Sequence, residues 1–183
     1  MIERMPPLDA AKMSEAQQKA AAALIAGPRK GVFGPFIALL RSPELLDRMQ
    51  RVGEYLRFGG TIPQRLNELA ILITARHVTN QFEWALHHPL ALKAGVARAT
   101  LDAVEARKRP DTMAADEAVV HDFVVELLRT SAVSDATYAH ALQHLEEAGV
   151  VDLTATVGYF VTVCLVMNVA RTPAPASEVK PLQ

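Results

Sequence analysis

The sequence predicts an all-α protein, and three observations support this. Residues that start and stop helices recur along the whole chain, and no alternating polar and apolar run bounded by hairpin turns is present. Half of the 183 residues are hydrophobic and 21% are charged, so the chain has enough apolar surface to form a packed core. We therefore expect one helical domain of about eight helices.

The N-terminal part begins with a capping signal. Ser14 and Gln17 have the spacing of a capping box, and the alanine-rich helix that they open should end at Gly27, which precedes a proline. Residues 29–35 form a glycine-containing loop. Pro43 suits the first turn of a second helix, which ends before a glycine pair.

The centre of the chain predicts a helical hairpin. Pro63 opens a helix that extends to Thr79 and places apolar residues on one face. Asn80 and Glu83 have the spacing of the cap and third position of the next helix, which ends at Gly95. The remaining helices are expected at 97–107, 114–129, 135–148 and 153–170.

The most apolar segment, residues 153–170, would span about 27 Å as a helix, which approaches membrane-spanning length. Threonines, a glycine and an asparagine interrupt it, and no basic cluster flanks it, so we expect a buried helix or an oligomer contact. Residues 1–13 and 172–183 are expected to be flexible, which leaves 14–171 as the domain.

Charge and cysteine content exclude several classes of function. A formal charge of −1 without basic runs argues against a nucleic-acid or anionic-membrane partner. The single cysteine, Cys164, cannot form an internal disulfide, a redox pair or a cysteine-rich zinc site, which favours a cytoplasmic protein. Residues 1–8 have no apolar segment of the kind found in signal peptides.

Three titratable residues of the hairpin are candidates for catalysis. Glu68 lies on the first helix, and Glu83 and His87 lie one turn apart on the second, so the hairpin can bring them together. A partly buried carboxylate beside an imidazole can exchange protons near neutral pH. The set therefore predicts a general acid/base relay.

Each of these residues also has a structural interpretation. Glu83 fits equally well as the capping-box acid that returns to the backbone N–H of Asn80. Glu68 fits an ordinary flank residue paired with Arg65. A lone histidine such as His87 is more often structural than catalytic, and spacing alone leaves these alternatives open.

The same segment resembles a known family. The motifs RLNELAIL at 65–72 and NQFEWALHHPLA at 80–91 are similar to the core of the carboxymuconolactone decarboxylase family, which includes the alkylhydroperoxidase D-like proteins. In the peroxidase branch, a glutamate is followed after eleven residues by a cysteine, after two more by a second cysteine, and after three more by a histidine. Counted from Glu68, those positions fall on Asn80, Glu83 and His87.

The missing cysteines distinguish the branches. Peroxide reduction at this site needs a nucleophilic thiolate and a resolving thiol, which Asn80 and Glu83 cannot supply. Cys164 lies in a distant apolar segment and is expected to be a packing residue. The acid and tryptophan before His87 resemble the decarboxylase-like, cysteine-less branch.

The resemblance implies an all-α, alkylhydroperoxidase D-like bundle that assembles as a homotrimer or homohexamer. It further implies a carbon–carbon lyase or isomerase that acts without a metal or other cofactor on a small carboxylated lactone or keto acid from aromatic catabolism. His87 would donate or accept the proton, Glu68 would orient it, and Glu83 would complete the relay or bind a substrate hydroxyl.

The substrate-binding candidates follow from charge and apolarity. Two acids near the reacting centre would repel a carboxylate substrate, so we expect Arg41 or Arg65 to clamp it. Phe36 and Trp84, together with Phe33, are expected to form apolar walls, although ordinary core packing explains each equally well.

Three other functions remain open at this stage. A metal site made by the two acids and the imidazole is chemically possible but matches no recognised signature. A thiol-dependent peroxidase is disfavoured by the missing cysteines. An oligomeric protein that binds small acids without converting them would keep the same helical frame.

Overall fold

The structure is a computed structural model that describes residues 2–183, and this range contains helices and no strand. Its α-helices are α1 (Glu15–Ala26), α2 (Pro35–Leu39), α3 (Pro43–Glu54), α4 (Gln64–His77), α5 (Gln81–Ala94), α6 (Arg98–Glu105), α7 (Ala115–Thr130) and α8 (Asp135–Ala170). Two short elements accompany them, the 3₁₀ turn η1 (Ala10–Lys12) and the π-helical turn η2 (Tyr55–Gly59). The all-α prediction is therefore confirmed.

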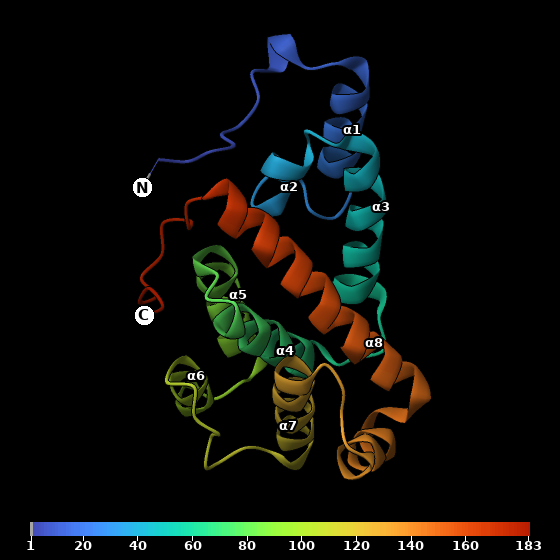
Figure 1. The fold of residues 1–183 in the computed structure, drawn as a ribbon, viewed down its shortest axis with the longest axis vertical. Helices are drawn as coiled ribbons and strands as arrows, with labels where there is room; N and C mark the ends of the chain where they lie inside the picture. Colours follow the sequence, from blue (N-terminus) through green and yellow to red (C-terminus); the bar gives the residue numbers. More distant parts are fainter. Residues whose placement is uncertain (1) are drawn as a thin grey trace.

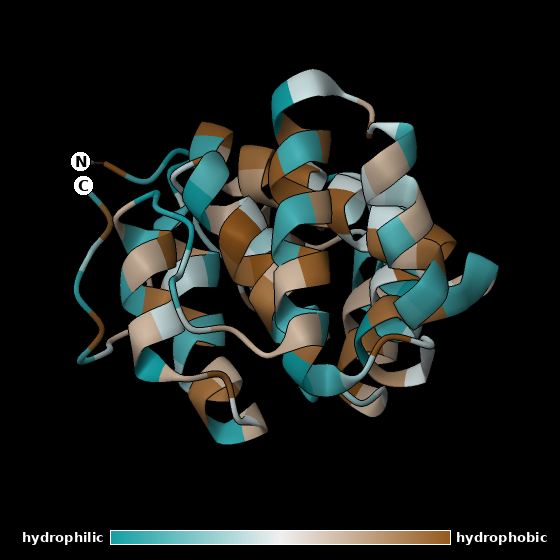
Figure 2. Ribbon diagram, turned by 90° about the horizontal axis from the view of Figure 1, so that it is seen from below, coloured by the Kyte–Doolittle hydropathy of each residue, from teal (hydrophilic) through white to brown (hydrophobic). Residues whose placement is uncertain are grey.

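Helix α4 lies at the centre of the fold, packed against α5, α7 and α8 (Figure 1). Most helices carry hydrophobic residues on one side and hydrophilic residues on the other (Figure 2). α4 differs, because every residue from Leu66 to Arg76 is buried, whereas the sequence pattern predicted one apolar face. Its polar residues Asn67 and Glu68 therefore lie in the core and need hydrogen-bond partners there.

The N-terminal helices α1–α3 form a second core beside α8. The predicted capping box is confirmed: Ser14 accepts from the N–H of Gln17, whose side chain accepts from Ser14. The loop before α2 ends at Gly34, which has a φ of +57°. A Cβ there would lie 2.7 Å from the ring of Phe82, so only glycine allows this loop to pack against α5.

Helix α8 joins two segments that the sequence predicted as separate helices. Its 36 residues are continuous except at Glu146, where a φ of 57° and a ψ of 178° produce a kink. Among residues 2–183 it is the one helix long and apolar enough to span a membrane by length and composition. Because 56% of its most apolar window is buried, α8 also fits the core helix predicted from its interruptions.

Both ends of the described chain contact the helical body. In the C-terminal segment, expected to be flexible, the backbone of Leu182 exchanges two hydrogen bonds of 2.8 Å with the side chain of Gln81. Near the other end, the N–H of Arg4 donates to the carbonyl of Ala170. The C-terminal segment thus packs on α5, and its mobility stays a prediction.

Candidate active site

The α4–α5 hairpin brings Glu68, Glu83 and His87 into contact. The Nδ1 atom of His87 lies 2.6 Å from Oε2 of Glu68, and its Nε2 atom lies 3.1 Å from Oε2 of Glu83. Both ring nitrogens therefore face a carboxylate, which is the arrangement of an imidazolium that donates two hydrogen bonds. The sequence prediction that these three residues meet agrees with this geometry.

Local capping explains how α5 presents two of these side chains. Asn80 accepts from the backbone N–H of Glu83 at 2.8 Å and so starts the helix. Its amide also donates to the carbonyl of Cys164 at 3.1 Å and to Asn168, which anchors the start of α5 to α8. From this fixed start, Glu83 and His87 project at i and i+4 from one side of the helix.

The structure excludes a capping-box role for the side chain of Glu83. In a capping box its carboxylate would accept from the N–H of Asn80, but that N–H donates to the carbonyl of Ala75 at 2.8 Å. The carboxylate of Glu83 contacts His87 instead. Glu83 therefore belongs to the cluster of titratable groups.

Burial and charge act on His87 in opposite directions. The side chain is 1% exposed and lies edge-on against Phe160, with ring centroids 5.5 Å apart. Burial lowers the pKa of His87, but hydrogen bonds to Glu68 and Glu83 and the charges of both acids outweigh it, so its pKa lies above the ordinary value. The two carboxylate contacts and the direction of the pKa shift therefore both favour the imidazolium.

This protonation state gives a measurable pH dependence. We expect the ring ¹⁵N and ¹H signals of His87 to report an imidazolium at pH 7, and to titrate above the ordinary histidine pKa of 6.5. Because the folded-state pKa is raised, the stability that His87 contributes is fully present below about pH 6.5 and is lost as pH rises through its raised pKa.

The Glu68→Gln variant tests the cause of that shift. Loss of one carboxylate should lower the pKa of His87, whereas Glu15→Gln, at an exposed position on α1, should leave it unchanged. A neutral ring in the unmodified protein at pH 6, assigned by comparison with a His87→Asn spectrum, would contradict the arrangement.

A small cavity adjoins the imidazole on the side of Glu83. It measures about 20 Å³, and aromatic and basic side chains dominate its lining. The contributing segments are the loop before α2, the C-terminal part of η2, α5 and α8. Its lining residues are Arg29, Phe33, Pro35, Phe36, Arg57, Phe82, Glu83, Leu86, His87, Tyr159, Phe160 and Val163.

Arg29 is the polar group in this cavity that lacks partners. Its Nε and Nη2 atoms are buried and make no hydrogen bond, while its guanidinium lies 4.6 Å from the ring centroid of Phe36. Burial lowers the pKa of Arg29, and the nearby Tyr159, Glu54 and Glu83 offset this only in part. A partly buried cation with unpaired donors is costly, which makes Arg29 a candidate anion-binding group.

Gly53 of α3 makes room for this arrangement. A Cβ at Gly53 would collide with the hydroxyl of Tyr159 and lie 2.8 Å from Nη2 of Arg29. Burial raises the pKa of Tyr159, which keeps its hydroxyl protonated and able to donate. Arg29 and Tyr159 thus bring two donors to one wall of the cavity.

The other predicted site residues divide into two groups. Phe36 lines the cavity as expected, together with Phe33. Arg41 and Arg65 do not: Arg41 donates to the carbonyls of Ile37 and Pro6, and Arg65 pairs with Asp116 and Glu117. Neither expected clamp residue lines the cavity, whose arginines are Arg29 and Arg57.

Trp84 also lies away from the cavity. Its ring packs edge-on against His88 at 5.5 Å, and it lines a different pocket under the C-terminal segment. The physical reason is the helix period, because Trp84 and His88 share one side of α5 while Glu83 and His87 share another. Trp84 is a core residue and not a wall of this site.

Neither a thiol nor a metal ion fits the site. Cys164 is fully buried, and burial raises the pKa of its thiol, which disfavours the thiolate. His87 directs both nitrogens at carboxylates, so neither is free to bind a metal. Within residues 2–183 no group of three His, Cys, Asp or Glu is arranged to hold one.

The sequence analysis missed Arg29 and Tyr159. Arg29 lies in a loop far from the hairpin, and Tyr159 lies within an apolar helix, so no local spacing connects either with His87. One signal was present, because Arg29 begins the glycine-containing loop of residues 29–35, which also contains Phe33.

Fold and site together define an all-helical class in which a central hairpin holds a buried imidazole between two acids. Residues 43–121 match the model of the carboxymuconolactone decarboxylase family. No curated protein matches the chain in sequence.

Two solved structures share the fold. An uncharacterised peroxidase-related protein from Ralstonia eutropha JMP134, described as an alkylhydroperoxidase AhpD core, has a TM-score of 0.76 and 15% identity, covering 96% of this chain and 93% of that one. A protein of unknown function from Agrobacterium tumefaciens, whose description connects it with the antioxidant defence protein AhpD, has a TM-score of 0.65 and 16% identity, covering 76% and 96%. The alkylhydroperoxidase D-like fold is thereby confirmed.

Proposed function

We propose that the protein is a cofactor-independent lyase or isomerase that acts on a small carboxylated lactone or keto acid. The observation that carries this proposal is the imidazolium of His87, held between two carboxylates at the edge of a cavity with an unpartnered arginine. Such a site contains both a proton donor and a fixed positive charge, which are the two groups this chemistry requires.

In decarboxylation, the bond between the carboxyl carbon and its neighbour breaks, and its electron pair stays on the neighbouring carbon as CO₂ leaves. The resulting enolate takes the proton of His87 at carbon, and His87 then regains a proton from water. Glu68 holds Nδ1 throughout, so that Nε2, on the cavity side, exchanges the proton once Glu83 moves or shares it.

Isomerisation uses the same groups. Glu83 would take a proton from one carbon, the imidazolium of His87 would give one to another, and the proton on Glu83 would then pass to His87. The intermediate enolate would be identical in kind. The choice between these two reactions depends on whether the bound substrate carries a carboxylate in a position to leave.

Arg29 should not bind the carboxylate that leaves as CO₂. A cation on that group would stabilise the reactant more than the transition state, because the negative charge leaves it as CO₂ forms. We assign Arg29, with the hydroxyl of Tyr159, to the carbonyl or lactone oxygen on which charge accumulates. A second carboxylate of the substrate would bind near Arg57, which lines the same cavity.

Substrate entry requires movement of the loop that precedes α2. The cavity of about 20 Å³ holds one water molecule at most, which is too little for a lactone. This loop contributes Arg29 and Phe33 and contains the glycines Gly31 and Gly34. We propose that it opens to admit substrate and closes to exclude water from the enolate.

The test is an untargeted conversion assay. We expect incubation with a mixture of aromatic-catabolite lactones and keto acids to give a product lighter by CO₂, or one of equal mass and changed retention, when followed by mass spectrometry. Binding without conversion would favour the small-acid-binding alternative, and thiol-dependent peroxide consumption that survives Cys164→Ser would favour a peroxidase.

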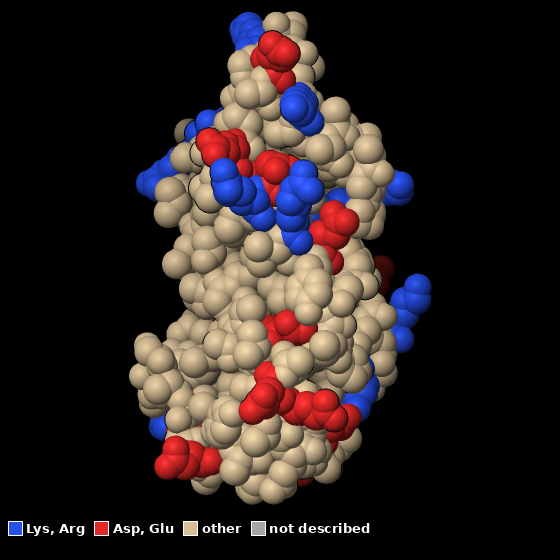
Figure 3. Space-filling view, turned by 90° about the vertical axis from the view of Figure 1, so that its right-hand side faces the viewer, with Lys and Arg blue, Asp and Glu red and all other residues tan. Residues whose placement is uncertain are grey.

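We also propose a homotrimer or homohexamer in the cytoplasm. Its support is an apolar stripe along the outer side of α8, the α8 face, in which Val151, Leu165 and Val169 are 66%, 49% and 58% exposed. On the side of the molecule seen in Figure 3, the middle is also largely free of charged residues, which gather above and below it. Exposed apolar area of this kind is typical of subunit contacts. The single cysteine agrees with a cytoplasmic location.

Gly158→Glu should separate the subunits. A Cβ at Gly158 meets no atom within 4 Å, so the larger residue fits the monomer and improves helix propensity. In an assembly it would bury a charge, and we expect the mass in sedimentation velocity to fall from three or six chains to one. Ala139→Glu, exposed on the same helix beyond the kink, should not change the mass. A monomeric unmodified protein at tens of micromolar would refute the proposal.

A further inference from the structure

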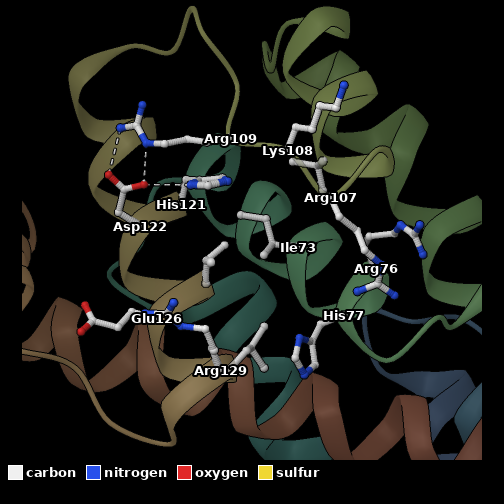
Figure 4. A pocket seen from close by; sticks show the side chains of 13 residues that line it. Ile73, Arg76, His77, Arg107, Lys108, Arg109, His121, Asp122, Glu126 and Arg129 are labelled. Atoms are coloured by element: carbon white, nitrogen blue, oxygen red, sulfur yellow. Dashed lines mark hydrogen bonds and ion pairs between the residues drawn. The ribbon is translucent and has the colours of Figure 1, made fainter.

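A second and much larger cavity lies at the other end of α4. It measures about 610 Å³ and opens between the end of α4, the turn after α6 and the outer side of α7 (Figure 4). It shares no lining residue with the cavity at His87. Two histidines, His77 and His121, belong to its lining.

The lining is strongly basic. It contains five Arg or Lys residues and two Asp or Glu residues, which gives a formal charge of +3 in a chain whose net charge is −1. The basic residues are Arg76, Arg107, Lys108, Arg109 and Arg129. A concave surface lined by one sign of charge concentrates ligands of the opposite sign.

The two acids of the lining are already engaged. Asp122 makes a two-pronged ion pair of 2.9 Å with Arg109 and contacts His121. Glu126 accepts from the backbone N–H of Ser134 and so serves the start of α8. Within residues 2–183 no acid lies in ion-pair contact with the other four basic residues of the lining. Their charge is therefore available to a ligand.

Arg76 is the residue that points most directly to such a ligand. It is 9% exposed, and its Nε donates to the backbone carbonyl of Glu105 at 2.6 Å, whereas its Nη1 atom is buried without a hydrogen-bond partner. Burial and the neighbouring Arg107 both lower the pKa of Arg76, and Glu105 offsets this only in part. An anion between Arg76 and Arg107 would relieve the repulsion between their charges.

The floor of the cavity is apolar. Ile73, Val104, Val125 and Leu128 line it, and Val125 is exposed there. Figure 4 shows Ile73 in the middle, with Arg76, Arg107 and Lys108 on one side and Arg109 on the other. The combination of an apolar floor and a basic rim fits a molecule with a hydrocarbon body and a negative head.

We propose that this cavity binds an amphipathic anion, with its carboxylate or phosphate head on Arg76, Arg107 and Lys108 and its apolar body on Ile73, Val104 and Val125. The site is separate from the one at His87, so its occupation would not depend on the proposed reaction. Carboxylate and phosphate heads share this chemistry, and the experiment separates them.

Calorimetric titration with octanoate and with octyl phosphate tests the proposal. We expect saturable binding of one molecule per chain for at least one of them, weakened by salt, and no binding of octanol or octylammonium. Tighter binding of one head identifies the anion. The ring signals of His77 and His121 should shift, while the emission of Trp84, which does not line this cavity, should stay constant.

Two variants locate the head group. Arg76→Gln should weaken binding about tenfold or more, and the double variant Arg107→Gln/Lys108→Gln, at exposed positions, provides the same test without touching a buried residue. Arg98→Gln, exposed on α6 and outside the lining, should bind as the unmodified protein does. Equal binding of octanol, or unchanged affinity in both variants, would overturn the assignment.

Discussion

Replacement of His87 by asparagine is expected to lower kcat of the proposed reaction by roughly 10²–10⁴-fold, which is the usual contribution of a positioned general acid or base. The physical reason is that the imidazolium lines the cavity and carries a transferable proton, with a carboxylate at each ring nitrogen. An amide can keep part of this hydrogen bonding, but it carries no transferable proton at neutral pH.

A matched control lies next to it in the sequence. His88 is also buried, but it packs against Trp84 on another side of α5, so His88→Asn should leave kcat within a few-fold of the unmodified value. The rates are taken per folded molecule, measured by circular dichroism, because His87→Asn leaves Glu68 and Glu83 buried without their cation. Equal rate losses in both variants would remove His87 from the mechanism.

The sequence could predict the hairpin because its determinants are local. Prolines and caps place the helix ends, and the i, i+4 spacing of Glu83 and His87 puts both on one side of α5. The same rule places Trp84 with His88 on another side, so the helix period separates Trp84 from Glu83 and His87. The period does not predict how α5 is rotated against α4, because that rotation depends on packing across the whole core.

Long-range features escape such rules for the same reason. Arg29, Gly53 and Tyr159 meet only because α1–α3 fold back onto α8, and none of them is near the others in sequence. The burial of α4 on all sides likewise depends on three neighbouring helices, whereas its own residues indicate a single face. Glu68 is therefore buried in the core, whereas its interpretation as an ordinary flank residue did not require burial.

Arg29→Met gives the second large effect, and its signature combines activity with stability. If Arg29 stabilises the developing charge on the substrate oxygen, its loss should lower kcat/KM by roughly 10²–10³-fold, as removal of a fixed donor does at other sites of this kind. At the same time the substitution removes a partly buried cation whose Nε and Nη2 have no partners, which favours the folded state. It also removes one contact with Phe36, which disfavours the folded state. We therefore expect the free energy of unfolding to stay constant or to rise by about 1 kcal/mol.

A residue retained only for the structure would behave in the opposite way, because its removal would reduce stability and affect activity only through unfolding. Arg41→Met, which removes the clamp first expected from the sequence, is the matched control, since Arg41 is exposed and bonded to backbone carbonyls away from the cavity. Chemical denaturation and initial rates measured on the same samples separate the two cases. A stability loss above about 1 kcal/mol in Arg29→Met with kcat/KM unchanged would show that Arg29 holds the loop before α2 in place and does not bind substrate, since a single lost hydrogen bond or contact accounts for a change of that size.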